Sequence, residues 1–191
     1  MSITSLAVME SKMMLIVLVS MCFATVFGKF LANDCKYTNP KTGRVYDLTP
    51  LISSNPSGYQ WSQMIWSIGG YYLDTLSNDF QLNVSLQLQL CKNVAPMFKG
   101  CNSTGAAYSY DAVNGCVNWG QATTAAFDVV PYGDGVFLQM YHGDVINHWQ
   151  KYMSNIYIVC DQSVTVPKPF LEHVKSDIRQ AHFQIKTKVV C

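Results

Sequence analysis

The sequence predicts an all-β domain stapled by disulfides. Three observations lead to this fold class: short runs of alternating apolar and polar residues, frequent proline and glycine between those runs, and six cysteines that follow an apolar N-terminal segment. Many short strands separated by turns are typical of a β-barrel or β-sandwich. We therefore expect one domain over residues 29–191, preceded by a processed segment at residues 1–28.

The N-terminal segment has the pattern of a secretory signal peptide. Lys12 precedes a short apolar run over residues 13–27, and Gly28 follows that run. A membrane-spanning helix needs roughly 18 or more apolar residues, so the pattern predicts a signal cleaved after Gly28, with an uncleaved anchor as the alternative. The mature chain is expected to lack a membrane span and to be secreted or to lie in the lumen of the secretory or endolysosomal pathway.

The surface of the mature chain is expected to be thinly charged and glycosylated. Charged residues make up 13% of the chain, against roughly 25% in ordinary soluble domains, and the formal net charge is +1. Such a chain has no strong field to attract nucleic acid, so that class of partner is not expected. Sequons at Asn83 and Asn102 predict glycans on the surface, whereas Asn55 precedes Pro56 and is excluded.

Four segments are predicted to be strands. Residues 80–90 alternate strictly between apolar and polar side chains, which indicates a strand with one buried face and with Asn83 on the polar face. Residues 136–141, 155–160 and 183–191 are the other three, and a turn is expected at residues 142–144. Cys160 and Cys191 lie in phase with the core positions of their strands, which permits a disulfide between neighbouring strands.

Two further segments have less regular patterns. Apolar residues at positions 61, 64, 65, 68, 72 and 76 fit a helical stripe, but Gly69 and Gly70 interrupt it, and residues 71–76 are interpreted as strand or loop. Residues 167–179 are charged and lack a clear period. We interpret them as a surface loop that includes at most one helical turn.

The cysteine count predicts three disulfides. The six residues after the signal are Cys35, Cys91, Cys101, Cys116, Cys160 and Cys191. An even count in an exported chain indicates a disulfide framework, although spacing alone does not choose among the pairings. No CxxC motif is present, and the four histidines (His142, His148, His173 and His182) fit no metal-binding spacing, so neither a metal nor a cofactor is expected.

Several short motifs follow one another along the chain. Asp34 and Cys35 precede the stretch YDLTPL at residues 46–51. The motifs that follow are a strand ending at Cys91, the pair Gly115-Cys116 leading to Gln121, the stretch VFLQMYHGD at residues 136–144, a strand ending at Cys160 and the stretch at residues 183–191. These motifs and their order resemble the mannose-6-phosphate-receptor-homology (MRH) family, in which a "DLSPL" motif stands at the place of DLTPL.

The resemblance implies a flattened β-barrel of two mostly antiparallel sheets. It also implies the disulfides Cys35–Cys91, Cys101–Cys116 and Cys160–Cys191. A fourth bridge that is usual in the family has no counterpart, because residues other than cysteine stand at both places, near Ile146 and Arg179.

The resemblance further implies a lectin-like module that binds mannose-type N-glycans or glycoproteins and is not an enzyme. The family's sugar site uses Gln, Arg, Glu and Tyr. Gln121 matches the glutamine, Glu172 lies near the glutamate, and Tyr152, beside Lys151, stands near the arginine. Charged planar partners make the stronger hydrogen bonds to sugar hydroxyls, and a lysine offers the charge without the guanidinium fork.

Other interpretations of these residues stay open on the sequence alone. Gln121 also fits an ordinary polar loop residue, and Glu172 also fits a solvated carboxylate. Ala181 stands at the family's tyrosine position, with His182 beside it as a candidate pH-sensitive contact. The replacements at Tyr152 and Ala181 favour an alternative function: a non-lectin protein-binding or structural module on the same fold. The oligomeric state is not predicted.

Overall fold

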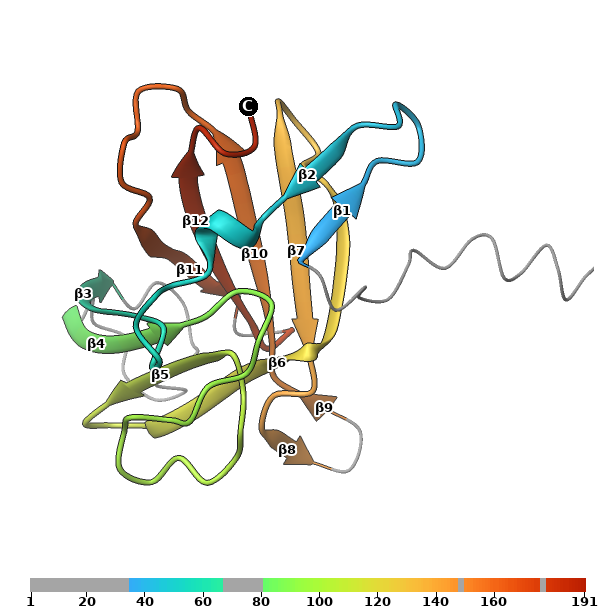
Figure 1. Ribbon diagram of the computed structural model, residues 1–191. Helices are drawn as coiled ribbons and strands as arrows, with labels where there is room; N and C mark the ends of the chain where they lie inside the picture. The colour runs from blue at the N-terminus through green and yellow to red at the C-terminus, as the bar shows by residue number, and fades with distance from the viewer. Residues whose placement is uncertain (1–34, 67–80, 148–149, 176–177) are drawn as a thin grey trace, which may run out of the picture.

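The computed structural model describes residues 35–66, 81–147, 150–175 and 178–191 and is all-β (Figure 1). The only helical element within these ranges is a 3-10 turn at Thr49–Leu51. The strands are β1 Lys36–Thr38, β2 Val45–Asp47, β3 Tyr59–Trp66, β4 Gln81–Leu88, β5 Ala107–Asp111, β6 Gly115–Val129, β7 Gly135–Tyr141, β8 Val145–Asn147, β9 Gln150–Lys151, β10 Met153–Cys160, β11 Pro169–Lys175 and β12 Gln180–Thr187. The predicted fold class is confirmed.

Eight strands form one long sheet in the order β11-β12-β10-β7-β6-β5-β4-β3. Neighbouring strands are antiparallel except β10 and β12, which are parallel. Strand β6 is long and changes register between Gln121 and Ala126, so its first part pairs with β5 and its second part with β7. The break divides the sheet into two mostly antiparallel halves that fold toward one another as a flattened, nearly closed barrel (Figure 1).

A glutamine side chain joins the two ends of this sheet. Gln63 of β3 donates from Nε2 to the carbonyl oxygen of Leu171 in β11 at 2.6 Å. Its Oε1 accepts the amide N–H of the same residue at 3.0 Å and the indole N–H of Trp61 at 3.2 Å. Because the free edge of β11 would otherwise expose these backbone groups, the carboxamide continues the hydrogen-bond ladder across the gap.

Strand β4 confirms the buried face predicted from residues 80–90. Leu82, Val84, Leu86 and Leu88 are buried in the core. The expectation that the glutamines of this segment point to solvent is wrong for Gln87 and Gln89, which are fully buried. Gln87 bonds to backbone groups of residues 57, 95 and 97, and Gln89 bonds to Ser53, because two loops pack over this end of the strand.

The other predicted strands are found with shifted bounds. Strands β7 and β10 cover residues 136–141 and 155–160, as predicted. Strand β12 begins at Gln180 and ends at Thr187, so the expected strand to residue 191 is too long. After Thr187 the chain turns: the N–H of Val189 bonds to the hydroxyl of Thr187, and the N–H of Cys191 bonds to the carbonyl of Lys188.

Both irregular segments contain a strand where the structure describes them. Residues 61, 64 and 65 of the apolar stripe lie in strand β3, whose ladder with β4 overrides a helical period, and residues 68, 72 and 76 lie outside the described residues. Residues 169–175, expected to be loop, form strand β11, because Pro169 and Leu171 pack opposite Ile185 and Phe183 of β12. Residues 1–34, with the predicted signal, and residues 71–76 lie outside the described residues.

The disulfides are Cys35–Cys91, Cys101–Cys116 and Cys160–Cys191, the pairs that the resemblance implies. Their Cα atoms lie 5.4, 5.3 and 4.7 Å apart, within the ordinary range for a bridge. Cys35–Cys91 ties the start of β1 to the end of β4, and Cys160–Cys191 ties the end of β10 to the segment that follows β12. The first of these two bridges lies at the half of the sheet that contains β4, and the second lies at the half that contains β10 and β12.

Candidate functional site

The candidate sugar residue Gln121 lies at the break in strand β6. It pairs in register with Tyr141 of β7 and is half-buried. Its Oε1 is 3.5 Å from the hydroxyl of Thr123, and its backbone carbonyl accepts the hydroxyl of Thr124 at 2.9 Å. The hydroxyl of Thr124 also lies 2.7 Å from the carbonyl of Tyr141, so threonine hydroxyls satisfy the backbone where the ladder is interrupted.

Lys151 and Tyr152 lie near the end of β7. Lys151 is exposed on β9, where it pairs with Val145 of β8. The ring of Tyr152 meets that of Trp119 edge to face, with 4.9 Å between the centroids. The backbone of this segment packs closely against Gly143. A Cβ at position 143 would lie 2.7 Å from the carbonyl oxygen of Tyr152 and 2.4 Å from the carbonyl oxygen of Asn118. The close approach therefore requires glycine in the motif HGD.

Glu172 lies apart from that region, and Ala181 points into the core. Glu172 is exposed on β11, and its Oε1 accepts a hydrogen bond from Gln184 Nε2 at 2.7 Å. The register places it level with Asn155 and two strands away, so its Cα is roughly 15 Å from that of Tyr152. Ala181 is fully buried in the core and cannot contact a ligand.

A row of polar side chains crosses the outward face of β7, β10 and β12, and we call it the outer-face network: Gln139, Tyr141, Asn155, Tyr157, Gln180 and His182. The Tyr141 hydroxyl donates to Gln139 Oε1, and Gln139 Nε2 donates to Asn155 Oδ1 at 2.7 Å. Asn155 Nδ2 contacts both Gln180 Oε1, at 2.7 Å, and His182 Nε2, at 3.2 Å. The first bond lies within β7, and the others join β7 to β10 and β10 to β12.

His182 ends this row as a buried, neutral histidine. It is 4% exposed, and its neighbour Asn155 is 3% exposed. The amide donor of Asn155 faces Nε2, so this nitrogen accepts, while Nδ1 carries the proton and donates to the Tyr157 hydroxyl at 3.3 Å. Burial, together with the smaller effect of the neighbouring charges of His173 and Lys175, lowers the pKa of His182 to about 4. The His173 ring stacks on it at 4.3 Å.

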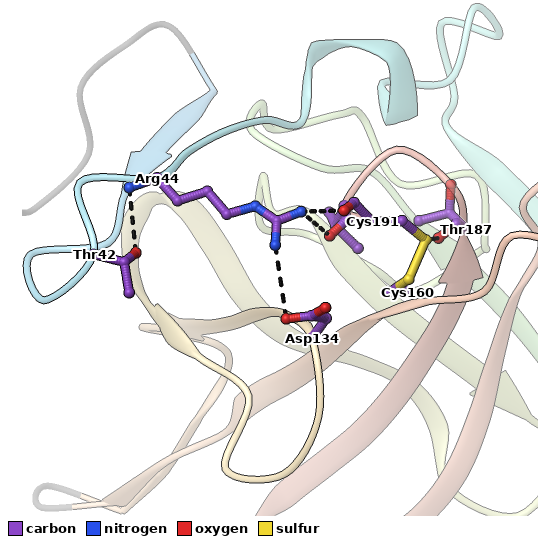
Figure 2. Close-up of polar contacts among 7 residues, drawn as sticks. Thr42, Arg44, Asp134, Cys160, Thr187 and Cys191 are labelled. Atoms are coloured by element: carbon purple, nitrogen blue, oxygen red, sulfur yellow. Dashed lines mark hydrogen bonds and ion pairs between the residues drawn. A yellow bond between two sulfur atoms is a disulfide. The ribbon is translucent and has the colours of Figure 1, made fainter.

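Arg44, which the sequence analysis did not single out, joins three segments that are distant in the sequence. Figure 2 shows its guanidinium between the β1–β2 turn, the β6–β7 turn and the end of the chain. It donates to the carbonyl oxygens of Val190, at 3.2 Å, and of Cys191, and pairs with Asp134 at 3.7 Å. The guanidinium carbon also lies 4.7 Å from the centre of the Tyr46 ring.

Three connections lie at the end of the barrel that Arg44 holds, and we call it the loop end: the β1–β2 turn, the β6–β7 turn and residues 161–168 (Figure 1). The N–H of Cys160 bonds to the carbonyl of Asp134 at 3.0 Å, which fixes the start of the third connection. Large apolar side chains are exposed there, with Val45 at 59%, Tyr132 at 93% and Val166 at 66%. Large apolar side chains exposed at one end of a domain are candidates for a contact surface.

Two solved structures share this arrangement of strands. Domain 11 of the echidna mannose-6-phosphate/IGF2R receptor is 23% identical, with a TM-score of 0.52, and the match covers 84% of this chain and 96% of that one. Chicken IGF2R domain 11 is 19% identical, with a TM-score of 0.56, and the match covers 86% and 96%. The chain has the MRH-type fold of IGF2R domain 11. No family model and no curated protein matches the sequence.

The IGF2R domain 11 fold and the three disulfides both fit an extracellular or luminal location. The described residues contain no helix of the length and apolarity that a membrane crossing requires. The same ranges hold no cluster of three or more histidine, cysteine or acidic side chains arranged for a metal ion.

Both sequons lie on the half of this fold that contains β3, β4 and β5. Asn83 is exposed on β4, and Asn102 is exposed in the connection between β4 and β5. Ser103, the next residue, is held by the carboxylate of Asp144 at 2.9 Å and by Asn118. Glycans at these two positions would therefore leave the loop end free.

Proposed function

We propose that the chain is an exported binding module whose ligand is a protein or glycoprotein surface, contacted at the loop end. The observation that carries this proposal is the exposure of Val45, Tyr132 and Val166 in three separate segments at one end of the barrel: the start of β2, the β6–β7 turn and residues 161–168. Exposed aromatic side chains supply much of the binding energy in protein interfaces. Arg44 holds two of these connections together, so little ordering would be needed on binding.

The proposal is for binding rather than catalysis. The echidna structure with this fold is a receptor domain. The outer-face network consists of side chains that hydrogen-bond one another, and its histidine, His182, is buried rather than presented to a substrate. These features support a role in recognition.

A mannose-type glycan at Gln121 is the second candidate, favoured by the half-buried position of this side chain at the break of β6, near Tyr141. Gln121 would bond to sugar hydroxyls, with Lys151, Tyr152 and Glu172 as the further contacts that the family pattern suggests. The buried Ala181, at the family's tyrosine position, weighs against this candidate. If it holds, Gln121→Ala abolishes retention on mannose-agarose and leaves the melting temperature unchanged.

A two-part retention experiment tests the proposal. The full chain is passed over mannose-agarose, and it is then immobilised and exposed to secretory-pathway proteins whose glycans have been removed enzymatically. We expect no retention on mannose, and retention of a deglycosylated protein that Tyr132→Ser abolishes. Tyr110→Ser is the matched control, because Tyr110 is exposed on the other half of the barrel. Elution of the chain from the column by free mannose would overturn the proposal.

A further inference from the structure

The outward face of β3, β4 and β5 carries one of the sequons, and we call it the sequon face. In register, Met64 of β3 lies opposite Asn83 of β4, and Ser85 of β4 lies opposite Tyr110 of β5. The hydroxyls of Ser62 and Ser85 are 3.3 Å apart on the same face. The face is therefore a small polar area around the sequon, with a large apolar side chain on either side.

The apolar side chains on this face are uncovered. Met64 is 52% exposed and Tyr110 is 37% exposed. The ring of Phe98, from the connection that follows β4, stacks on Tyr110 with 5.8 Å between the centroids and 20° between the ring planes. Large apolar side chains exposed on the same face of a sheet favour association between copies unless something covers them.

The sequon is placed to supply that cover. Residues directly opposite in an antiparallel pair have Cβ atoms about 4.5–5.5 Å apart, so a sugar on Asn83 begins beside the Met64 side chain. Tyr110 lies on the diagonal, one strand over and two residues along, at a Cα distance of roughly 8 Å. The first two sugars of an N-glycan can therefore reach both apolar side chains without any change in the backbone.

We propose that the N-glycan of Asn83 covers the sequon face, with its first N-acetylglucosamine packed on Met64 and the second sugar extending toward Tyr110. Attachment joins Asn83 Nδ2 to C1 of the sugar, Nδ2 loses one proton, and the pyrophosphate of a lipid-linked oligosaccharide leaves. The C–H face and the acetamide methyl of the sugar contact the flexible thioether, which adapts to irregular partners. One of the Ser62 and Ser85 hydroxyls donates to the other, so one hydroxyl hydrogen remains available to the acetamide oxygen.

This inference is independent of the proposed ligand, because the sequon face and the loop end involve different strands. It assigns the glycan a packing role on the protein itself. It also predicts that the exposed methionine is protected from solvent in the mature protein, although it is open in the bare polypeptide.

The test is a cycle between glycan and methionine. The full chain is secreted from glycosylating cells and trimmed by an endoglycosidase to one N-acetylglucosamine per site. Four proteins are compared: the native chain, Asn83→Gln, Met64→Ser and the double variant. With Met64 present, we expect the sugar at Asn83 to raise the melting temperature by about 2–4 °C. With Met64→Ser the difference should fall to less than half. Asn102→Gln is the control, and its effect should be the same in both backgrounds.

A second measurement does not depend on stability. In protein labelled at the methionine methyl groups, the Met64 methyl should show a nuclear Overhauser effect to the acetamide methyl of the sugar. Equal effects of the Asn83 sugar with Met64 and with Met64→Ser, together with no such contact, would overturn the inference. So would peptide mapping that finds Asn83 unmodified in the secreted protein.

Discussion

Acidification should destabilise this fold through one histidine. His182 is neutral in the folded state because it is buried and its Nε2 accepts a hydrogen bond from the amide nitrogen of Asn155, which cannot accept one in return. Its pKa falls from 6.5 to about 4 on folding. Between those two pH values the unfolded chain binds the additional proton, so protonation favours unfolding.

The magnitude follows from the size of the shift. A pKa unit corresponds to 1.36 kcal/mol, so a change from 6.5 to about 4 makes the folded state about 3 kcal/mol less stable below pH 4 than above pH 6.5. The contribution is absent above pH 6.5 and grows as the pH falls toward 4. A protonated Nε2 would also place two donors against each other, which requires the Asn155 amide to flip and so disturbs the outer-face network.

Urea unfolding at a series of pH values from 4 to 7.5 measures this effect. His182→Gln is the informative variant, because its amide can accept from Asn155 and donate toward Tyr157 without titrating. We expect the stability of the native protein to fall more steeply with acidification than that of the variant. The carboxyl groups of Asp47 and Asp161, whose pKa values hydrogen bonds lower, contribute equally to both proteins and cancel.

His173→Gln is the matched control, because His173 stacks on the same ring but is exposed. Its loss should raise the pKa of His182, by removing a positive neighbour, and should keep most of the dependence on pH. Parallel stability profiles for the native protein and His182→Gln would refute the reasoning.

Three further predictions concern the framework. Gln63→Leu should lower the free energy of unfolding by about 2–3 kcal/mol, because it leaves the N–H and C=O of Leu171 without their partner. Thermal unfolding measures this loss against the exposed control Gln60→Leu, and an equal loss in the two variants would contradict the prediction. Arg44→Lys should lower the free energy of unfolding, measured in urea, by about 1–2 kcal/mol, because an ammonium cannot bond two carbonyls and an aspartate from one plane. Lys41→Ala serves as the control, and an unchanged free energy for Arg44→Lys would show that the contacts are dispensable. Replacing Cys35 and Cys91 together by serine should cost about 4 kcal/mol, since the bridge closes a loop with a sequence separation of 56; an unaltered denaturation midpoint would contradict this.

The strands were predictable where one face is apolar and the other is solvated. Leu82, Val84 and Leu86 show this pattern, and all three are buried in β4. The same period failed for Gln87 and Gln89, because loops that are distant in sequence cover the polar face and satisfy both amides. Periodicity indicates which residues share a face, but it does not show whether another segment covers that face.

The candidate sites were less predictable than the strands. Asn155 and His182 occupy polar-phase positions in strands, and only the pairing of β10 with β12 brings them together. Arg44 gave no signal in the sequence, because its partners Asp134, Val190 and Cys191 are 90 or more residues away and meet it through the fold. The family pattern matched candidate residues by their position in the sequence, but it did not show which of them are neighbours in space. Glu172 and Tyr152 lie on different parts of the barrel.

The most direct test of the proposed function is site-specific photocross-linking in cells that secrete the chain. A photoreactive phenylalanine analogue is introduced at Tyr132 in one protein, at Gln121 in a second and at Tyr110 in a third. We predict a covalent adduct with a protein from position 132 alone, and an adduct that persists when free mannose is added. An adduct that forms from position 121 and disappears with mannose, with none from position 132, would contradict the account.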